Sequence, residues 1–255
     1  MIPTTRATIS AAAAALIAAT GFLGTRYLAA GVLVLVILTA LGWPHLARIS
    51  STMVSGWIMA ARSMVSSWIV AGGGVLAIGA VLLGRTEPYL RYVIVAVAAI
   101  TIAALVSEIF FPSQRGHAIH SVASTASGGA IVASGATWVA ANRTVGAEDL
   151  VVAGAVVLAV AAVAAVLTPN ANVNALLSLV LGVGTGVGMG LLFPSMTWWG
   201  GALVGLSCAV AVVLTNELYR REPRPRTVMA GIASGVTPVL VAGLLVYLAG
   251  RLLVG

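Results

Sequence analysis

The stretch YLAAGVLVLVILTALGW, residues 27–43, decides the fold class of this chain. It holds no charged side chain, follows Arg26 and runs directly into Pro44. A helix that crosses the hydrocarbon core of a bilayer needs about 17–25 such residues. Trp43 is typical of a membrane interface, and a proline stops a helix. We therefore interpret residues 27–43 as a membrane-spanning helix.

The composition of the whole chain agrees with that interpretation. Of its 255 residues, 60% are hydrophobic and 7% are charged, whereas a soluble domain carries roughly 25% charged residues. So few charges cannot cover a soluble surface, and so much apolar surface does not stay disordered, which excludes both classes. At about 20 residues per span with short loops, the length accommodates about eight spans.

Further apolar runs predict seven more spans, at residues 68–84, 90–111, 118–141, 150–168, 174–193, 197–217 and 228–250. The connections between them are too short to hold a separate soluble domain. We expect residues 1–255 to form one all-α transmembrane domain, a polytopic helix bundle with glycine-rich helix packing.

Two segments admit alternatives. Residues 1–26 contain an Ala-rich stretch at 7–24, which is either a ninth span or an interfacial helix. In residues 50–66, apolar side chains recur at helical spacing opposite Ser51, Ser55 and Arg62. That amphipathic pattern predicts a helix lying flat at the interface. The alternative is an N-terminal extension of the span at 68–84.

The arginines set the expected orientation. All 13 basic residues are Arg, and they are divided among short loops, which excludes a basic face for nucleic acid. With eight spans, the loops on one side carry seven arginines and those on the other carry six; if residues 7–24 also span, the division is eight to five. By the positive-inside rule we place the densest loop, residues 218–227, in the cytoplasm of a bacterial cell with this protein in its inner membrane.

Polar chemistry gathers at the turn between the spans at 90–111 and 118–141. The candidate residues for substrate contact or coupling are Glu108, Arg115, His117, His120, Ser121 and Ser124. The histidines and serines fall on one helical stripe. Such a stripe suits proton transfer or an anionic head group, because histidine titrates near neutral pH; the alternative is an ordinary interfacial turn. Two histidines and one distant glutamate do not make a metal site, and we expect none.

A second cluster follows the span at 197–217. Its candidate residues for lipid phosphate are Arg220, Arg221, Arg224 and Arg226. Guanidinium groups fit phosphate oxygens, so this loop could bind lipid head groups. Alternatively it serves only as a topology anchor.

Glycines recur at every second position of residues 182–190. Positions four apart lie on one helix face, so two ridges of small residues result. We expect helix packing at Gly182, Gly184, Gly186, Gly188 and Gly190. In the last span, Pro238 predicts a kink that is either a hinge or static.

Nothing in the chain points to catalysis. It contains no Gly-x-Ser-x-Gly motif, no pair of carboxylates within one loop that suits acid-base work, and no Asp-rich metal motif. We expect neither enzymatic activity nor a cofactor.

Three short features carry a family resemblance: Arg26 leading a span that ends in Gly42-Trp43-Pro44, the polar turn with Arg115 and His117, and the final stretch 246–252. In these features the chain resembles actinobacterial multi-pass membrane proteins labelled permeases. The resemblance implies transport in the cell envelope. It carries over no functional residue.

These observations favour a transporter-like inner-membrane protein that moves or positions an anionic amphiphile or small solute. Membrane lipid is the expected partner, with a membrane-protein partner or a second copy as alternatives. One alternative function is a non-catalytic scaffolding subunit of an envelope-assembly complex, whose glycine ridges would be docking faces. Another is a membrane enzyme acting on lipid, which would need a cleft holding Glu108 and both histidines.

Overall fold

The computed structural model describes the chain except for residues 1–2, 48–55, 85–86, 113–116, 145–147, 223–224, 226 and 255. The described residues form nine α-helices and no β-strand. The helices are α1 (Pro3–Leu23), α2 (Thr25–Leu46), α3 (Gly56–Leu83), α4 (Val93–Phe110), α5 (Ala118–Arg143), α6 (Glu148–Ala164), α7 (Ala171–Leu192), α8 (Trp198–Arg221) and α9 (Val228–Val254). The all-α prediction is confirmed.

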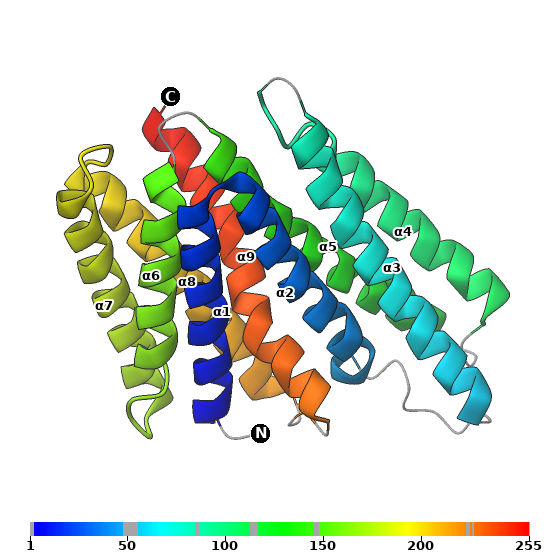
Figure 1. The fold of residues 1–255 in the computed structure, drawn as a ribbon. Coiled ribbons are helices and arrows are strands. Elements are labelled where there is room, and N and C mark those ends of the chain that lie inside the picture. Colours follow the sequence, from blue (N-terminus) through cyan, green and yellow to red (C-terminus); the bar gives the residue numbers. More distant parts are fainter. Residues whose placement is uncertain are drawn as a thin grey trace.

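The helices alternate in direction, so the two termini lie at opposite ends of the bundle (Figure 1). Helix α9 lies at the centre and packs against α1, α2, α5, α6 and α8. Helices α4 and α7 lie at opposite edges, α4 against α3 and α5, and α7 against α6 and α8. We call the end that holds the start of α1 and the end of α8 the N-terminal end.

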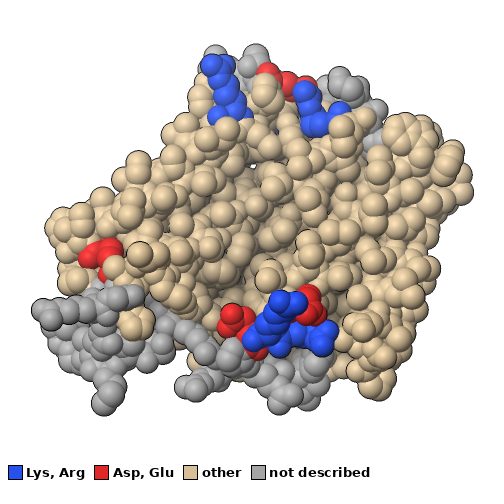
Figure 2. Space-filling view, turned by 180° about the vertical axis from the view of Figure 1, so that it is seen from behind, with Lys and Arg blue, Asp and Glu red and all other residues tan. Residues whose placement is uncertain are grey.

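The outer surface of the bundle is apolar. Seven of the described helices are long and apolar enough to cross a membrane. Large apolar side chains on edge helix α4 face outward, with Ile94 75% exposed and Ile109 77% exposed. Charged side chains gather at the two ends and leave a broad uncharged band between them (Figure 2). Because lipid tails can cover such a band, this is the surface of a multi-pass membrane protein.

Helices α5 and α6 are not among those seven. Helix α6 is a shorter apolar helix, and α5 is rich in Ser, Thr and Gly. The polar composition of α5 suits its place between other helices, because small residues let backbones approach closely. Trp138 on α5 is fully buried, and its Nε1 donates to the Val239 carbonyl of α9 at 2.8 Å. Helix α5 coincides with the run predicted at residues 118–141.

The Ala-rich segment forms helix α1, which packs against α6, α9 and α2. Gly24 joins it to α2 with φ +111°, a left-handed conformation that glycine adopts without strain. Residues 4–23 are one of the seven candidate spans. Of the two alternatives for this segment, the structure therefore favours the helix that spans, and it places Arg6 at the same end as Arg220 and Arg221.

The interfacial helix predicted at residues 50–66 is not present in the described part of that range. Residues 56–66 form the first turns of α3, which continues to Leu83 without a break, and residues 50–55 lie outside the described residues. The described part of the polar face is explained by neighbouring helices, since Arg62 contacts Glu108 of α4 and Ser66 contacts Thr125 of α5. The alternative, an extension of the next span, is correct for residues 56–66.

The two glycine ridges of α7 have different surroundings. Gly182, Gly186 and Gly190 are buried against α8, where Gly201 and Gly205 face them. A Cβ at Gly184 or Gly188 would meet no atom within 4 Å. One ridge thus packs inside the bundle and the other faces outward. Pro238 is buried within the continuous helix α9, and its role as a hinge stays a prediction.

Candidate functional site

The candidate site is built on an ion pair between α3 and α4 near the N-terminal end. Arg62 Nη2 lies 3.3 Å from Glu108 Oε2, and each side chain is only 14% exposed. Glu108 is two residues from the end of α4, where the partial negative charge of the helix terminus disfavours a carboxylate. The positive charge of the Arg62 guanidinium offsets both the Glu108 carboxylate and the partial negative charge of the helix end.

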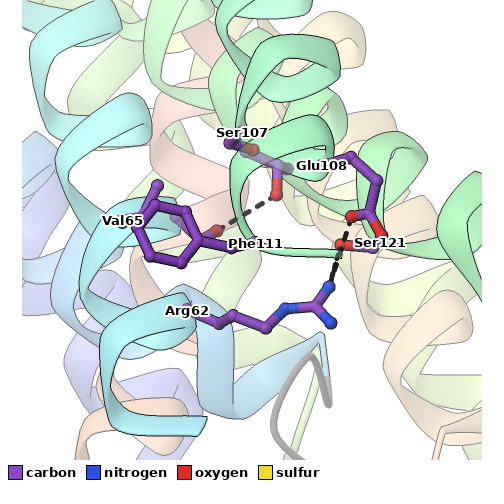
Figure 3. A pocket seen from close by; sticks show the side chains of 8 residues that line it. Arg62, Val65, Ser107, Glu108, Phe111 and Ser121 are labelled. Carbon is purple, nitrogen blue, oxygen red and sulfur yellow. Dashed lines mark hydrogen bonds and ion pairs between the residues drawn. The ribbon is translucent and has the colours of Figure 1, made fainter. Parts of the chain in front are cut away.

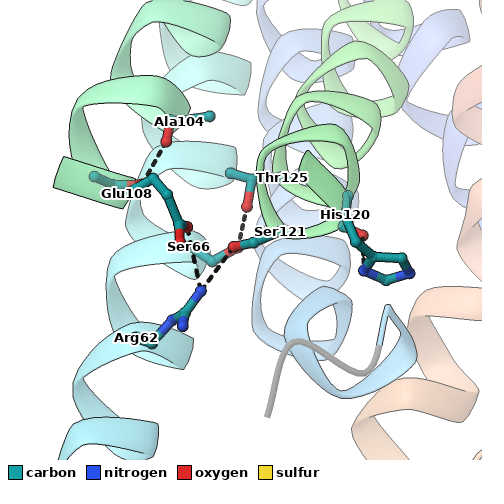
Figure 4. Close-up of polar contacts among 9 residues, drawn as sticks. Arg62, Ser66, Ala104, Glu108, His120, Ser121 and Thr125 are labelled. Atoms are coloured by element: carbon teal, nitrogen blue, oxygen red, sulfur yellow. Dashed lines mark hydrogen bonds and ion pairs between the residues drawn. The ribbon is translucent and has the colours of Figure 1, made fainter. Parts of the chain in front are cut away.

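Hydroxyl groups extend this pair along α5. Arg62 Nη2 also donates to Ser121 Oγ at 2.8 Å. One turn further, Ser66 Oγ and Thr125 Oγ1 are 3.1 Å apart and buried. We call Arg62, Ser66, Glu108, Ser121 and Thr125 the polar seam. Figure 4 shows its side chains directed toward one another from three helices.

The polar seam lines an open recess (Figure 3). The rest of the recess is lined by Val65, Ser107 and Phe111. Its empty volume is about 250 Å³, counting the open solvent at its mouth. Because this volume includes open solvent, the recess is a partly open indentation and not an enclosed ligand cavity. A polar group that approaches its mouth would meet the side chains of the polar seam.

Farther from the N-terminal end, an apolar side chain fills the space between the same three helices, α3, α4 and α5. Ile100 of α4 is 3% exposed and fills a notch beside Gly73 of α3 and Gly129 of α5. A Cβ at either glycine would overlap the Ile100 side chain. The absence of side chains at the two glycines leaves room for Ile100. Beyond the Ser66–Thr125 contact, the space between the three helices is therefore filled by tightly packed apolar side chains.

The structure separates the predicted candidates at this turn. Glu108 and Ser121 belong to the polar seam, whereas His117 precedes α5 and is exposed. The ring of His120 points away from the Arg62–Glu108 pair, with Nδ1 3.4 Å from Ser124 Oγ (Figure 4). Arg115 lies outside the described residues.

The predicted phosphate cluster is partly engaged with a carboxylate. Arg220 Nη1 and Arg221 Nε lie 2.9 Å and 3.2 Å from the two oxygens of Glu217. These groups are exposed at the N-terminal end of the bundle. Arg224 and Arg226 lie outside the described residues.

Arg62 is the residue that the sequence reasoning did not place in the site. Its signal was present, because Arg62 and Ser66 are four residues apart, as are Ser121 and Thr125. Each pair lies on one helix face, so two helices present matching polar stripes.

In the part of the chain that the structure describes, no group of three or more His, Cys, Asp or Glu side chains is arranged to hold a metal ion. The arrangement offers a paired guanidinium and carboxylate with hydroxyl neighbours, which suits recognition of a small charged group.

The chain matches no family model, no curated protein and no solved structure in the comparisons made with each. Function is therefore inferred from the geometry of the polar seam and its surroundings.

Proposed function

We propose that this chain is a transporter-like protein of the bacterial inner membrane that moves or positions an anionic amphiphile. In this proposal the polar seam receives the head group, and the N-terminal end of the bundle faces the cytoplasm. The observation that carries the proposal is the part-buried Arg62–Glu108 pair in a recess of a largely apolar bundle. Ionisable groups within membrane helices are costly, and they usually mark a functional path.

The surroundings of the recess favour an amphiphile over a wholly polar solute. Met64 and Trp68 on α3 are 64% and 77% exposed, and Ile109 and Phe110 on α4 are 77% and 73% exposed. These residues follow Arg62 and Glu108 in the sequence and lie on other sides of α3 and α4. A molecule with its polar group in the recess would have its tail beside two helices whose outward side chains are apolar.

The ion pair itself suggests how binding is controlled. An anion that reaches Arg62 competes with the Glu108 carboxylate for the same guanidinium. We therefore propose that Glu108 weakens binding of the anionic group, and that replacing its carboxylate with a neutral amide strengthens binding.

The test is movement of a fluorescent phosphatidylglycerol analogue between the leaflets of proteoliposomes containing the full chain. We expect Arg62→Ala to abolish movement above the protein-free background. We expect Glu108→Gln to keep movement and to bind the analogue more tightly than the unaltered protein. Glu217→Gln is the matched control, because it removes an exposed carboxylate at the same end, and it should bind the analogue as the unaltered protein does.

Movement that is unchanged in Arg62→Ala would refute the proposal. Unchanged affinity for the analogue in Glu108→Gln would show that Glu108 does not control binding. The roles predicted for Arg115, His117 and His120 are tested in the same assay by single alanine variants. Because His120 points away from the pair, we expect His120→Ala to move lipid at the rate of the unaltered protein.

A second candidate function, a scaffolding subunit, is favoured by the outward glycine ridge of α7. A Cβ added to Gly184 or Gly188 would find open space for 4 Å around it, so a helix of another protein could approach there. Gly184→Leu should then remove a stoichiometric partner during purification in mild detergent. Gly186→Leu is not suitable for this test, because Gly186 already packs against α8.

The enzyme alternative requires Glu108 and both histidines in one cleft. The recess is lined by Glu108 and not by His117 or His120. The geometry therefore supports a binding role for Glu108 better than a shared acid-base site.

A further inference from the structure

A second guanidinium lies at the N-terminal end, away from the polar seam, where α1, α8 and α9 meet. Arg6, in the first turns of α1, places its Cζ 4.8 Å from the centre of the Tyr219 ring on α8. The Tyr219 hydroxyl donates to Thr237 Oγ1 on α9 at 2.9 Å. The aromatic face attracts the cation and fixes where it lies.

The backbone beneath Arg6 is held closely against α9. Ser10 Oγ is within hydrogen-bond distance of the Arg6 carbonyl, at 3.1 Å, and of the Gly235 carbonyl, at 2.6 Å. A Cβ at Gly235 would lie 2.7 Å from Ile9 Cγ2, so only glycine permits this approach. The position of Arg6 is therefore set by packing on two neighbouring helices.

The charge of Arg6 is not balanced by the described side chains. Arg62 pairs with Glu108, and Arg220 and Arg221 share Glu217. No described carboxylate lies within ion-pair distance of Arg6, and its buried Nε has no hydrogen-bond partner among the described residues. A half-buried cation without an anion is unfavourable.

We propose that Arg6, positioned by the Tyr219 ring, binds the phosphate of an anionic phospholipid. Arg6 is the third residue of candidate span 4–23, so its long side chain is within reach of lipid head groups at that end of the helix. A head group with its own cation suits this environment less well. The proposal does not depend on transport, because the lipid would be held whether or not the protein moves one.

The test is native mass spectrometry of the full chain in detergent with equal amounts of phosphatidylglycerol and phosphatidylcholine. We expect the unaltered protein to retain phosphatidylglycerol preferentially, and Arg6→Gln to lower that retention about ten-fold. Arg6→Lys should retain more than Arg6→Gln. Arg26→Gln is the matched control, since it removes an exposed arginine near the start of α2 at the opposite end.

Equal retention of the two lipids by the unaltered protein would overturn the proposal, as would full retention by Arg6→Gln. Displacement of the lipid by millimolar inorganic phosphate would assign the site to a soluble anion instead. If Arg6→Gln does not fold, Tyr219→Leu removes the ring that positions the guanidinium and should lower retention in the same way. Failure of lipid movement alone, with retention intact, would refute the transport proposal and leave this site standing.

Discussion

Replacing Gly186 with alanine tests the close backbone contact between α7 and α8. An ideal Cβ on Gly186 would lie 2.8 Å from the Gly205 Cα, and closer still to the Gly201 carbonyl oxygen, whereas ordinary contact begins at 3.4 Å. Both neighbours are backbone atoms of α8, so no side chain can rotate away. Helices α7 and α8 must separate by at least about 0.6 Å, the difference between 2.8 Å and 3.4 Å.

Gly184→Ala provides the matched comparison, because it lies on the same helix and its Cβ would meet nothing within 4 Å. Both variants gain helix propensity, by up to about 1 kcal/mol. Only Gly186→Ala adds overpacking, which costs roughly 1–3 kcal/mol. We therefore expect Gly186→Ala to be less stable than Gly184→Ala by that overpacking cost.

The assay is reversible thermal unfolding in mixed detergent, followed by tryptophan fluorescence. The measured quantity is the midpoint temperature of unfolding. A difference of 1 kcal/mol shifts the midpoint of a protein of 150–250 residues by roughly 2–4 °C. The two variants should therefore differ by about 2–12 °C, with Gly184→Ala at or above the unaltered protein. Equal midpoints, or a lower midpoint for Gly184→Ala, would refute the assignment of the inner and outer glycine ridges.

Three further predictions concern single contacts. Arg143→Met should lower the free energy of unfolding by about 1.5–3 kcal/mol and speed hydrogen exchange in the last turn of α3, because the guanidinium donates to carbonyls there. Unchanged exchange would show that Arg143 does not cap α3. In a double-mutant cycle, the effects of Ser66→Ala and Thr125→Val on the free energy of unfolding should be non-additive by about 0.6 kcal/mol. Additive effects would show that the two hydroxyl groups form no stabilising hydrogen bond. Trp138→Phe should lower stability by about 1–3 kcal/mol in the same unfolding assay through the lost bond to Val239; an unaltered midpoint would contradict it.

Much of the fold could be predicted because long apolar runs have one stable form in lipid. A backbone in hydrocarbon must satisfy its own hydrogen bonds, so each run becomes a helix. The run predicted at 118–141 is α5, Ala118–Arg143, and the run at 228–250 is α9, Val228–Val254. Apart from the start of α3, the helix ends differ from the predicted ones by a few residues, because the apolar pattern fades gradually and gives no sharp boundary.

The segment at 50–66 shows where periodicity is insufficient. A polar stripe on an apolar helix has the same sequence pattern whether it faces head groups or polar side chains of other helices. What decides is the partner, and Arg62 has Glu108 on α4, 46 residues away in sequence. The pattern correctly identified a helix and a polar face, and only the tertiary contact shows which surroundings that face has.

The glycine ridges pose the same problem in apolar surroundings. Sequence spacing gives two equivalent ridges on α7, and nothing within residues 182–190 distinguishes them. The rotation of α7 is set by α8, where Gly201 and Gly205 are also four residues apart and meet Gly186 and its neighbours. Matching small-residue spacing in two consecutive spans was visible in the sequence, but which ridge it selects required the structure.

The polar seam could have been found by a different use of the same sequence. Glu108 was predicted to act with His117 and His120 because the three residues are close in the sequence. Inside a membrane, however, an ionisable side chain within an apolar helix needs a partner of opposite charge at the same depth. Arg62 and Glu108 meet that condition, since Arg62 lies near the start of α3 and Glu108 near the end of α4, which runs in the opposite direction. Pairing charges by depth within antiparallel helices therefore predicts this ion pair, whereas pairing them by sequence distance does not.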